Sequence, residues 1–191
     1  MKAYEKKPTE IAGCCMISSL YVEDDRGLFD KPFEREKYHE IGQEFSCDEV
    51  FFSHSHRNVI RGLHFQTERP QEKIIRVLRG AVFDVVVDLR QGSPSYGKWM
   101  GRELSLSNHW SLIVPSGCAH GFLTLSKDAD VLYICKGAYD KPSDSGIRYD
   151  DADIGIDWPL AKLDKVIISE RDAGLMSFSE YEHINRFVWK A

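Results

Sequence analysis

The sequence predicts an all-β protein, either a sandwich or a barrel. Short runs rich in β-branched and aromatic residues follow one another from residue 49 to residue 135, and such runs are typical of strands. Breaks that contain glycine, proline or serine separate them at the spacing of roughly 8–12 residues that is typical of this class. The chain of 191 residues shows no repeat, low-complexity segment or linker, so we expect residues 1–191 to form one domain.

Two local signals precede the strand-rich region. An apolar stretch at residues 17–22 ends at Asp25-Arg26-Gly27, where we expect the chain to turn. A short helix is expected near residues 32–41, because aromatic and aliphatic side chains recur there at the spacing of one helix face.

The strand-rich region and the tail differ in their patterns. Arg79-Gly80 separates two apolar runs and predicts a hairpin turn or a bulge, and residues 92–97 predict a loop. Residues 163–189 have helix-like spacing, and Ser177 is placed to cap a final helix at residues 180–187. The expected strands lie at residues 50–52, 59–60, 74–78, 81–89, 104–106, 110–114, 121–125 and 131–135.

Composition and charge exclude several classes of function. The formal net charge of −5 argues against general nucleic-acid binding, which needs a basic face. The N-terminus is polar and no apolar run is long enough to span a bilayer, so we expect a cytoplasmic protein with no membrane contact. Five cysteines without a CxxC spacing indicate small buried thiols rather than a disulfide framework or a zinc site.

Two histidines beside glycines are the first candidates for chemistry. His64 follows Arg61-Gly62-Leu63, and in an alternating strand Gly62 would share its face and leave open space beside the imidazole. Taken alone, His64 fits a core histidine bound to a backbone carbonyl better than a catalytic base. His120 follows a turn at Pro115-x-Gly117.

Charged residues within apolar strands are the second set of candidates. Asp84 lies inside the apolar run at residues 82–87, where a carboxylate is costly unless it is paired, and His120 is its natural partner. Lys73 begins the strand after His64. Its ammonium group is either a solvated strand end or a cation that stabilises an oxyanion.

Two tyrosines and one charge run complete the candidates. Tyr133 and Tyr139 flank Cys135-Lys136-Gly137. A strand tyrosine is usually a packing residue, but a phenol opposite a histidine is a suitable acid for proton transfer at carbon. By itself, Ser169-Glu170-Arg171-Asp172 is typical of a charged surface segment.

A metal-dependent function would use a different set of histidines. His54-Ser55-His56 is an HxH pair, and Pro115-x-Gly117-x-x-His120 is similar to half of a cupin metal motif. No glutamate follows the HxH pair at the usual short spacing, and the sequence does not supply a convincing set of three or four ligands. We therefore predict no metal and no other cofactor.

Taken together, these segments closely resemble the dTDP-4-dehydrorhamnose 3,5-epimerase family. The resemblance implies a cupin-type jelly-roll β-barrel with short N-terminal and C-terminal helical segments, a homodimer, and activity without a metal. Weaker similarity extends over residues 16–175. The matching motifs, in order, are residues 59–66 (VIRGLHFQ), 73–90, 92–99, 114–126 and 155–159 (GIDWP).

The resemblance also implies a role for each catalytic candidate. His64 would be the base, oriented by Asp172, and Tyr133 would be the acid on the opposite face of the sugar. Lys73 would stabilise an enolate at the C4 oxygen. The substrate would be a nucleotide-linked 4-keto-6-deoxyhexose, with dTDP-4-dehydro-6-deoxyglucose, which is converted to dTDP-4-dehydrorhamnose, as the default.

The remaining implied roles concern substrate binding. His120 would pair with Asp84 beside the sugar, and Arg26, Arg61 and Arg171 would contact the nucleotide phosphates, which suit the fork of arginine. The full set implied to bind the substrate is Arg26, Phe29, Lys31, Glu49, Phe51, Arg61, Gln66, Tyr139, Asp144 and Arg171.

The sequence departs from the family mainly on the nucleotide side. Glu49-Val50-Phe51 replaces a usual Gln-x-Asn, Lys31 replaces a glutamate, and Asp144 and Arg171 replace a glutamate and a lysine. These changes leave open a CDP, GDP or UDP carrier and an enzyme that inverts only C3 or only C5. Two functions from different classes also stay open, namely a non-catalytic nucleotide-sugar-binding cupin and a metal-dependent cupin enzyme.

Overall fold

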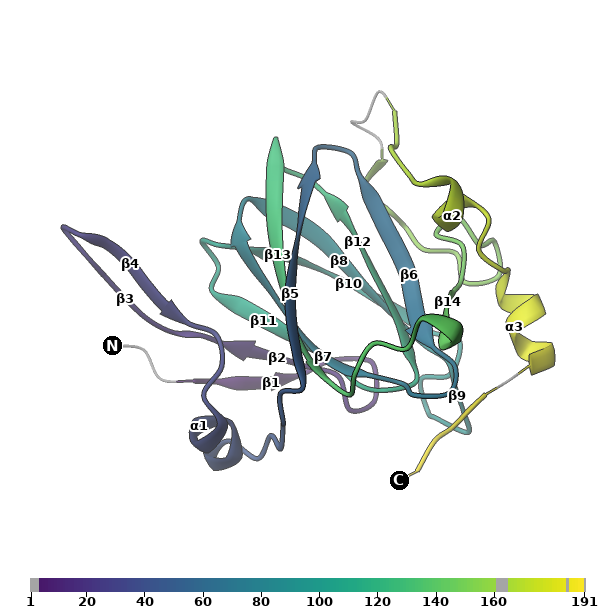
Figure 1. The fold of residues 1–191 in the computed structure, drawn as a ribbon, viewed down its shortest axis with the longest axis horizontal. Coiled ribbons are helices and arrows are strands. Elements are labelled where there is room, and N and C mark those ends of the chain that lie inside the picture. Colours follow the sequence, from purple (N-terminus) through teal and green to yellow (C-terminus); the bar gives the residue numbers. More distant parts are fainter. Residues whose placement is uncertain (1–3, 161–164, 185, 191) are drawn as a thin grey trace.

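Two antiparallel sheets face each other and form the body of the molecule in this computed structural model, which describes residues 4–160, 165–184 and 186–190 (Figure 1). This arrangement confirms the predicted all-β jelly roll. The six-stranded sheet has the order β1 (Lys6–Pro8), β2 (Cys15–Ser18), β11 (Trp110–Val114), β7 (Glu72–Arg79), β13 (Asp128–Lys136) and β5 (Glu49–His56). The five-stranded sheet has the order β10 (Trp99–Ser105), β8 (Ala81–Asp88), β12 (Cys118–Thr124), β6 (Ile60–Gln66) and β14 (Asp144–Gly146).

Smaller elements surround the sheets. The hairpin of β3 (Leu20–Asp24) and β4 (Gly27–Lys31) turns at the predicted place and projects away from the sandwich (Figure 1). Helix α1 (Arg35–Glu40) confirms the helix expected near residues 32–41. The C-terminal part contains the 3-10 helix η1 (Lys141–Ser143), α2 (Glu170–Ala173), α3 (Phe178–Ile184) and β15 (Phe187–Val188). Strand β15 pairs in parallel with β9 (Arg90–Gln91) from the middle of the chain.

The central strands are buried on both faces. Val86 faces the cluster between the two sheets, whereas its neighbours Val85 and Val87 pack outward with Tyr181 of α3 in a second cluster. Strands covered on both sides have continuous apolar sequences rather than alternating ones, which explains the run at residues 81–89. Asp84 has the same parity as Val86 and therefore points between the sheets.

The turn at Gly80 does not join a hairpin. Strand β7 belongs to the six-stranded sheet and β8 to the five-stranded sheet, so Gly80, with a φ of 75°, carries the chain from one sheet to the other. The predicted hairpin is wrong, because apolar runs on each side of a turn do not show whether the two strands pair. An irregularity does occur beside the turn, where the register of β7 against β13 shifts between Val77 and Arg79.

The C-terminal helix is shorter than predicted. Ser177 caps it as expected, since its Oγ accepts a hydrogen bond from the Glu180 amide at 3.2 Å. The helix ends at Ile184, and Phe187 lies in β15, where its backbone pairs with Arg90. Burial of the Phe187 ring at 6% exposure outweighs the local helical pattern. Residues 163 and 164, at the start of the segment with helix-like spacing, and residue 185 of the predicted helix lie outside the described part of the chain.

The remaining local predictions are confirmed only in part. The loop at residues 92–97 and four buried cysteines are confirmed, but the thiol of Cys47 is exposed. The N-terminal region was expected to contribute a strand, but no bounds were predicted for β1 to β4, since three of these strands have exposed or half-exposed side chains and therefore carry a weak apolar pattern.

A buried ionic cluster joins the loop after β8 to the barrel. Asp88 is fully buried and accepts hydrogen bonds from Arg90 Nε at 2.7 Å, Ser93 Oγ at 2.5 Å and Ser95 Oγ at 2.6 Å. Burial alone would raise the pKa of Asp88, but these hydrogen bonds lower it below its usual value. The carboxylate is therefore ionised and fully paired at neutral pH.

We expect Asp88→Asn to lower the free energy of unfolding by about 3–5 kcal/mol at pH 7, because it leaves the buried Arg90 without its anion. A carboxylate whose pKa is depressed by folding stabilises the protein above its unfolded pKa, and this contribution is lost as the pH falls through the folded pKa. The difference between variant and wild type should therefore shrink below about pH 4, as measured by urea unfolding. Asp150→Asn removes an exposed partner of Arg148 and serves as the control. An equal loss in both variants would contradict the buried cluster.

Candidate active site

A β-bulge in β6 places two functional side chains on the same side of the strand. His64 pairs with His120 of β12, but Arg61 pairs with Phe122, so three steps along β6 match two along β12. Arg61 and His64 therefore both line the space between the sheets. The expectation that side chains alternate strictly between the two faces of this strand is therefore wrong between Arg61 and His64.

The bulge also gives Gly62 another role than the one predicted. A Cβ at Gly62 would lie 2.6 Å from Gly121 Cα and 2.8 Å from the His120 carbonyl oxygen, and φ at Gly62 is 119°. Glycine is thus required for the close approach of β6 and β12. It does not leave open space beside His64.

Six of the candidate residues line one cavity of about 200 Å³ inside the barrel. Sequence reasoning missed Ser53 and Gly121. The period of two along β5 could have indicated Ser53, which follows Phe51 on the same face. The lining residues are Phe51, Ser53, Arg61, His64, Lys73, His120, Gly121 and Tyr133.

His64 is held by a carboxylate from a distant part of the chain. Its Nε2 lies 2.9 Å from Asp172 Oδ1, and the other oxygen, Oδ2, accepts a hydrogen bond from the Gly62 amide at 3.0 Å. Burial acts to raise the pKa of Asp172, but the hydrogen bonds from His64 and Gly62 lower it overall. An ionised Asp172 thus orients the imidazole, and Nδ1 is the nitrogen that can take a proton from a substrate.

Helix α2 positions Asp172. Ser169 caps this short helix by accepting a hydrogen bond from the Asp172 amide at 3.0 Å. The segment that resembled a charged surface run therefore folds back against β6. Its Arg171 lies beside the same imidazole, with Nη1 at 3.5 Å from His64 Nε2.

The predicted pair of His120 and Asp84 is confirmed. His120 Nε2 lies 3.0 Å and 2.9 Å from the two carboxylate oxygens of Asp84. Asp84 has 0% exposure and His120 has 5%. Burial raises the pKa of Asp84, and the interaction with His120 opposes that shift.

Asp84→Asn is expected to cost about 3 kcal/mol of folding stability and to reduce activity, because it weakens the buried partner of His120. Thermal and urea unfolding measure the first effect. The double variant Asp84→Asn/His120→Gln should lose less than the sum of the two single variants, since neither partner is then left buried without the group that it binds. An unchanged melting temperature in Asp84→Asn would argue against an ionic pair.

Tyr133 lies between two other rings of the cavity. Its ring stacks on Phe51 with centroids 4.6 Å apart and planes 12° apart, and it meets His120 edge-on at 6.0 Å. Burial raises the pKa of Tyr133, and the nearby Asp84 adds to the shift. The phenol is therefore protonated at neutral pH and can act as a proton donor.

Lys73 brings a positive charge to the cavity wall. Burial lowers the pKa of its ammonium group, while Cys135, Asp144 and Glu49 oppose the shift. A cation in a partly dehydrated cavity stabilises a developing oxyanion more strongly than one in water.

Four of the expected substrate-binding residues form a connected group near this cavity. Asp144 Oδ2 accepts hydrogen bonds from Arg171 Nη2 at 2.7 Å and from the Tyr139 hydroxyl at 3.0 Å. The Tyr139 amide donates to Glu49 Oε2 at 3.0 Å. These contacts link β5, β14 and α2 through side chains that can also bind polar groups of a substrate.

Two further candidates have polar contacts within the chain. The Gln66 side-chain amide donates to the carbonyls of Arg69 and Ala138 and accepts from the Asp140 amide, so it holds two loops together. Arg61 donates from Nε to Ser55 Oγ at 2.8 Å, which fixes the guanidinium at the cavity wall.

Three candidates do not reach the cavity of their own chain. Arg26, Phe29 and Lys31 lie on the projecting hairpin β3–β4 (Figure 1). Arg26 pairs with Asp24, Lys31 pairs with Glu34, and Phe29 is 57% exposed. Within one chain the structure does not bring these three residues to the cavity of His64, because the hairpin extends away from both sheets (Figure 1). Their expected contact with the substrate stays a prediction.

Comparison with known proteins identifies the family to which a chain with this site belongs. A family model described as dTDP-4-dehydrorhamnose 3,5-epimerase matches residues 8–180. The chain belongs to the dTDP-4-dehydrorhamnose 3,5-epimerase family. The dTDP-4-dehydrorhamnose 3,5-epimerase of Methanothermobacter thermautotrophicus is 47% identical over 164 residues, which are 86% of this chain and 89% of that protein.

Solved structures of the epimerase family have the same fold. The dTDP-6-deoxy-D-glucose-3,5-epimerase of Legionella pneumophila, in complex with dTDP-4-keto-L-rhamnose, is 36% identical with a TM-score of 0.92, covering 98% of this chain and 100% of that one. ChmJ, a 3'-monoepimerase from Streptomyces bikiniensis in complex with dTDP-quinovose, is 29% identical with a TM-score of 0.86, covering 95% of this chain and 91% of that one. Among the described residues, no helix is long and apolar enough to cross a membrane.

Proposed function

We propose that this member of the epimerase family inverts C3 and C5 of a nucleotide-linked 4-keto-6-deoxyhexose and converts dTDP-4-dehydro-6-deoxyglucose to dTDP-4-dehydrorhamnose. The observation that carries the proposal is the meeting of a carboxylate-held histidine, a buried tyrosine and a lysine around one cavity. A binding module would need no such acid–base set. The names of the relatives support the same substrate class.

The first half of the reaction is proton removal. The hydrogens at C3 and C5 are weakly acidic because both carbons flank the C4 carbonyl. His64 takes one of these protons, and the electron pair of the C–H bond moves onto the C4 oxygen to form an enolate. The Lys73 ammonium stabilises that negative charge, and the Asp172 carboxylate stabilises the imidazolium that forms.

The second half is proton delivery to the other face of the ring. The enolate carbon takes the phenolic proton of Tyr133, so the configuration is inverted and the C4 carbonyl re-forms. His64 has then gained one proton and Tyr133 has lost one, and exchange with solvent restores both. Two groups on opposite faces perform an inversion that a single base cannot easily perform.

The nucleotide would lie outside the catalytic cavity. A volume of about 200 Å³ is smaller than the roughly 300–1,000 Å³ of typical ligand pockets, so it suits the sugar alone. Arg61 and Arg171 lie beside His64 and would bind the phosphates, since a guanidinium fork matches phosphate oxygens. A catalytic metal or cofactor has no part in this scheme.

We also propose that the protein is a cytoplasmic homodimer in which the hairpin β3–β4 completes the site of the partner. Exposed apolar side chains gather on the hairpin, at Val22, Leu28 and Phe29, and on β5, at Val50 and Phe52. Contact between the hairpin of one protomer and β5 of the other would bury both sets. It would also bring Arg26, Phe29 and Lys31 near a cavity that they cannot reach in their own chain. Four of the five cysteines are small buried thiols, as is usual for proteins of a reducing compartment.

Co-expression of two inactive variants tests the shared site. Arg26→Ala and His64→Asn are each expected to impair the homodimer. A mixed dimer should regain one intact site if Arg26 acts in the partner. At equal expression this gives roughly one quarter of the wild-type rate, because half of the dimers are mixed and have one intact site of two. Activity no higher than that of the two variants measured separately would contradict the exchange of hairpins.

A second candidate function is inversion at one carbon only. Phe51 stacks on Tyr133 at a position where the family usually has asparagine, so one face of the tyrosine ring is covered. The 3'-monoepimerase ChmJ is among the structural relatives. If Tyr133 reaches only one of the two carbons, the enzyme inverts only that centre.

Proton NMR in heavy water with dTDP-4-keto-6-deoxyglucose separates these functions. Deuterium at both C3 and C5 is the expected result for the double epimerase. Incorporation at one carbon supports the single-centre enzyme. If no deuterium is incorporated, the proposal that the substrate carries dTDP is contradicted. The CDP, GDP and UDP sugars are then tested, together with the variant Glu49→Gln/Phe51→Asn on the dTDP sugar.

A further inference from the structure

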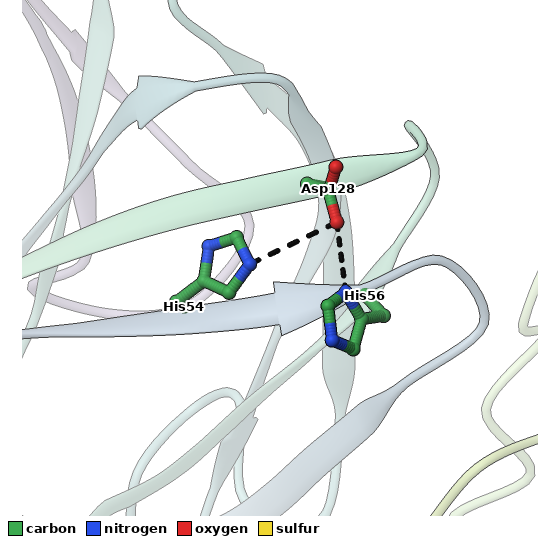
Figure 2. A group of neighbouring side chains, drawn as sticks. All are labelled: His54, His56 and Asp128. Carbon is green, nitrogen blue, oxygen red and sulfur yellow. Dashed lines mark hydrogen bonds and ion pairs between the residues drawn. The ribbon is translucent and has the colours of Figure 1, made fainter.

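Two histidines and an aspartate meet on the outer surface of the barrel, away from the catalytic cavity. His54 and His56 are two residues apart on β5 and therefore share a face. Asp128 of β13 lies directly opposite His56 in the register of the two strands. Figure 2 shows the three side chains turned toward one another. Ser53 and Ser55 alternate with these histidines along β5 and face the cavity, so the two histidines point to the opposite, outer side of the sheet.

The distances suit a shared ion. One ligand atom from each residue lies within 4.8 Å of the other two. His56 Nδ1 is 2.8 Å and His54 Nε2 is 3.8 Å from Asp128 Oδ1. Tetrahedral bonds to zinc place neighbouring ligand atoms about 3.3 Å apart, between these two values. Both imidazoles are partly exposed, at 41% and 75%, so small rotations of their rings can bring the three atoms to that spacing.

A second carboxylate orients the first histidine. His54 Nδ1 lies 2.6 Å from Asp130 Oδ1, and Asp130 is in turn paired with Arg79 Nε at 3.0 Å. Histidine ligands of metals usually donate their other ring N–H to a carboxylate in this way, which leaves the lone pair of Nε2 toward the ion. Arg79 Nη2 also lies 3.1 Å from Nδ1. The two carboxylates and one guanidinium of this group carry a net negative charge, which favours a cation.

We propose that His54, His56 and Asp128 bind a divalent transition-metal cation such as Zn²⁺, with water completing its coordination. Two imidazoles and one carboxylate match the ligand preference of such ions. The site would fasten β5, an edge strand of the six-stranded sheet, to β13. Because β5 also carries Phe51 and Ser53 of the cavity and Ser55, which holds Arg61, the ion would stabilise one wall of the site. The proposal does not depend on which sugar the enzyme uses.

Titration of the tag-free protein with Zn²⁺ and with Ni²⁺ by calorimetry tests the proposal. We expect one ion per chain and a rise in melting temperature with ion concentration, as binding to the folded state requires. His54→Gln and His56→Gln should each weaken binding at least tenfold and abolish the thermal shift. His39→Gln is the matched control, because His39 is also an exposed histidine paired with an acid, Glu44. The control should bind like the wild type.

Three results would overturn the site. If saturable binding survives in the double variant His54→Gln/His56→Gln, the ion binds elsewhere. If binding is lost in His64→Asn, the ion binds in the catalytic cavity. If no saturable binding occurs, the cluster is a set of histidine–carboxylate pairs only. The visible spectrum of bound Co²⁺ gives an independent check, since tetrahedral nitrogen and oxygen ligation produces a d–d absorption that the two histidine variants should lose.

Discussion

Replacement of His64 by asparagine is expected to abolish exchange of the C3 and C5 hydrogens with solvent. Asparagine cannot take a proton from carbon, whereas the imidazole is held for that purpose by Asp172 at 2.9 Å. Loss of a general base typically lowers the rate by about 10²–10⁴-fold. The loss should be at the upper end here, because formation of the enolate is the first step of both exchange and inversion. Deuterium incorporation measured by proton NMR gives the rate directly, and His64→Ala should behave in the same way.

The interpretation of this variant requires an intact fold. His39→Asn, at an exposed histidine paired with Glu44, should exchange both hydrogens at the wild-type rate. The melting temperature of His64→Asn should remain close to that of the wild type, since the imidazole is 29% exposed and Asp172 keeps its hydrogen bond from the Gly62 amide. Full exchange activity in a folded His64→Asn protein would refute the mechanism.

Tyr133→Phe is expected to lower the rate of inversion by at least about 10²-fold while some exchange of hydrogen for deuterium remains. Phenylalanine keeps the ring that stacks on Phe51 and meets His120, so the cavity keeps its shape. It lacks the proton that the opposite face of the enolate must receive. His64 can still remove a proton and return a deuteron to the same face.

The rate of inversion and the rate of deuterium incorporation, measured on the same sample, distinguish loss of the acid from a general loss of activity. Epimer formation and deuterium incorporation are followed together, and their ratio should fall sharply in Tyr133→Phe. Tyr96→Phe removes a hydroxyl that lies 3.5 Å from Glu182 at an exposed position and should leave the ratio unchanged. Wild-type inversion in Tyr133→Phe would mean that another group is the acid.

Local sequence patterns were sufficient for much of the fold. The apolar runs at residues 74–78 and 81–89 correspond to β7 and β8, and Ser177 caps α3. These features depend on side-chain burial and on contacts between residues close in the chain, which composition and spacing report directly. The pairing of β7 was misjudged because two adjacent apolar strands can lie in one sheet or in two.

The third ligand of the proposed metal site also could not be predicted from local sequence patterns. His54 and His56 are an evident pair in the sequence, but Asp128 is 72 residues from His56. Only the pairing of β5 with β13 brings the carboxylate to the imidazoles. A search for ligands at short spacing could not find it.

The strand-rich character of the chain and, through its motifs, the candidates for acid–base chemistry could be predicted from the sequence. The three-dimensional fold was needed to show which of these candidates meet. Asp172 comes to His64 from 108 residues away, and a bulge places Arg61 on the same side as His64. Arg26 is carried away from both on the hairpin. Strand register and long-range packing control these outcomes, and they depend on contacts across the whole barrel rather than on neighbours in the chain.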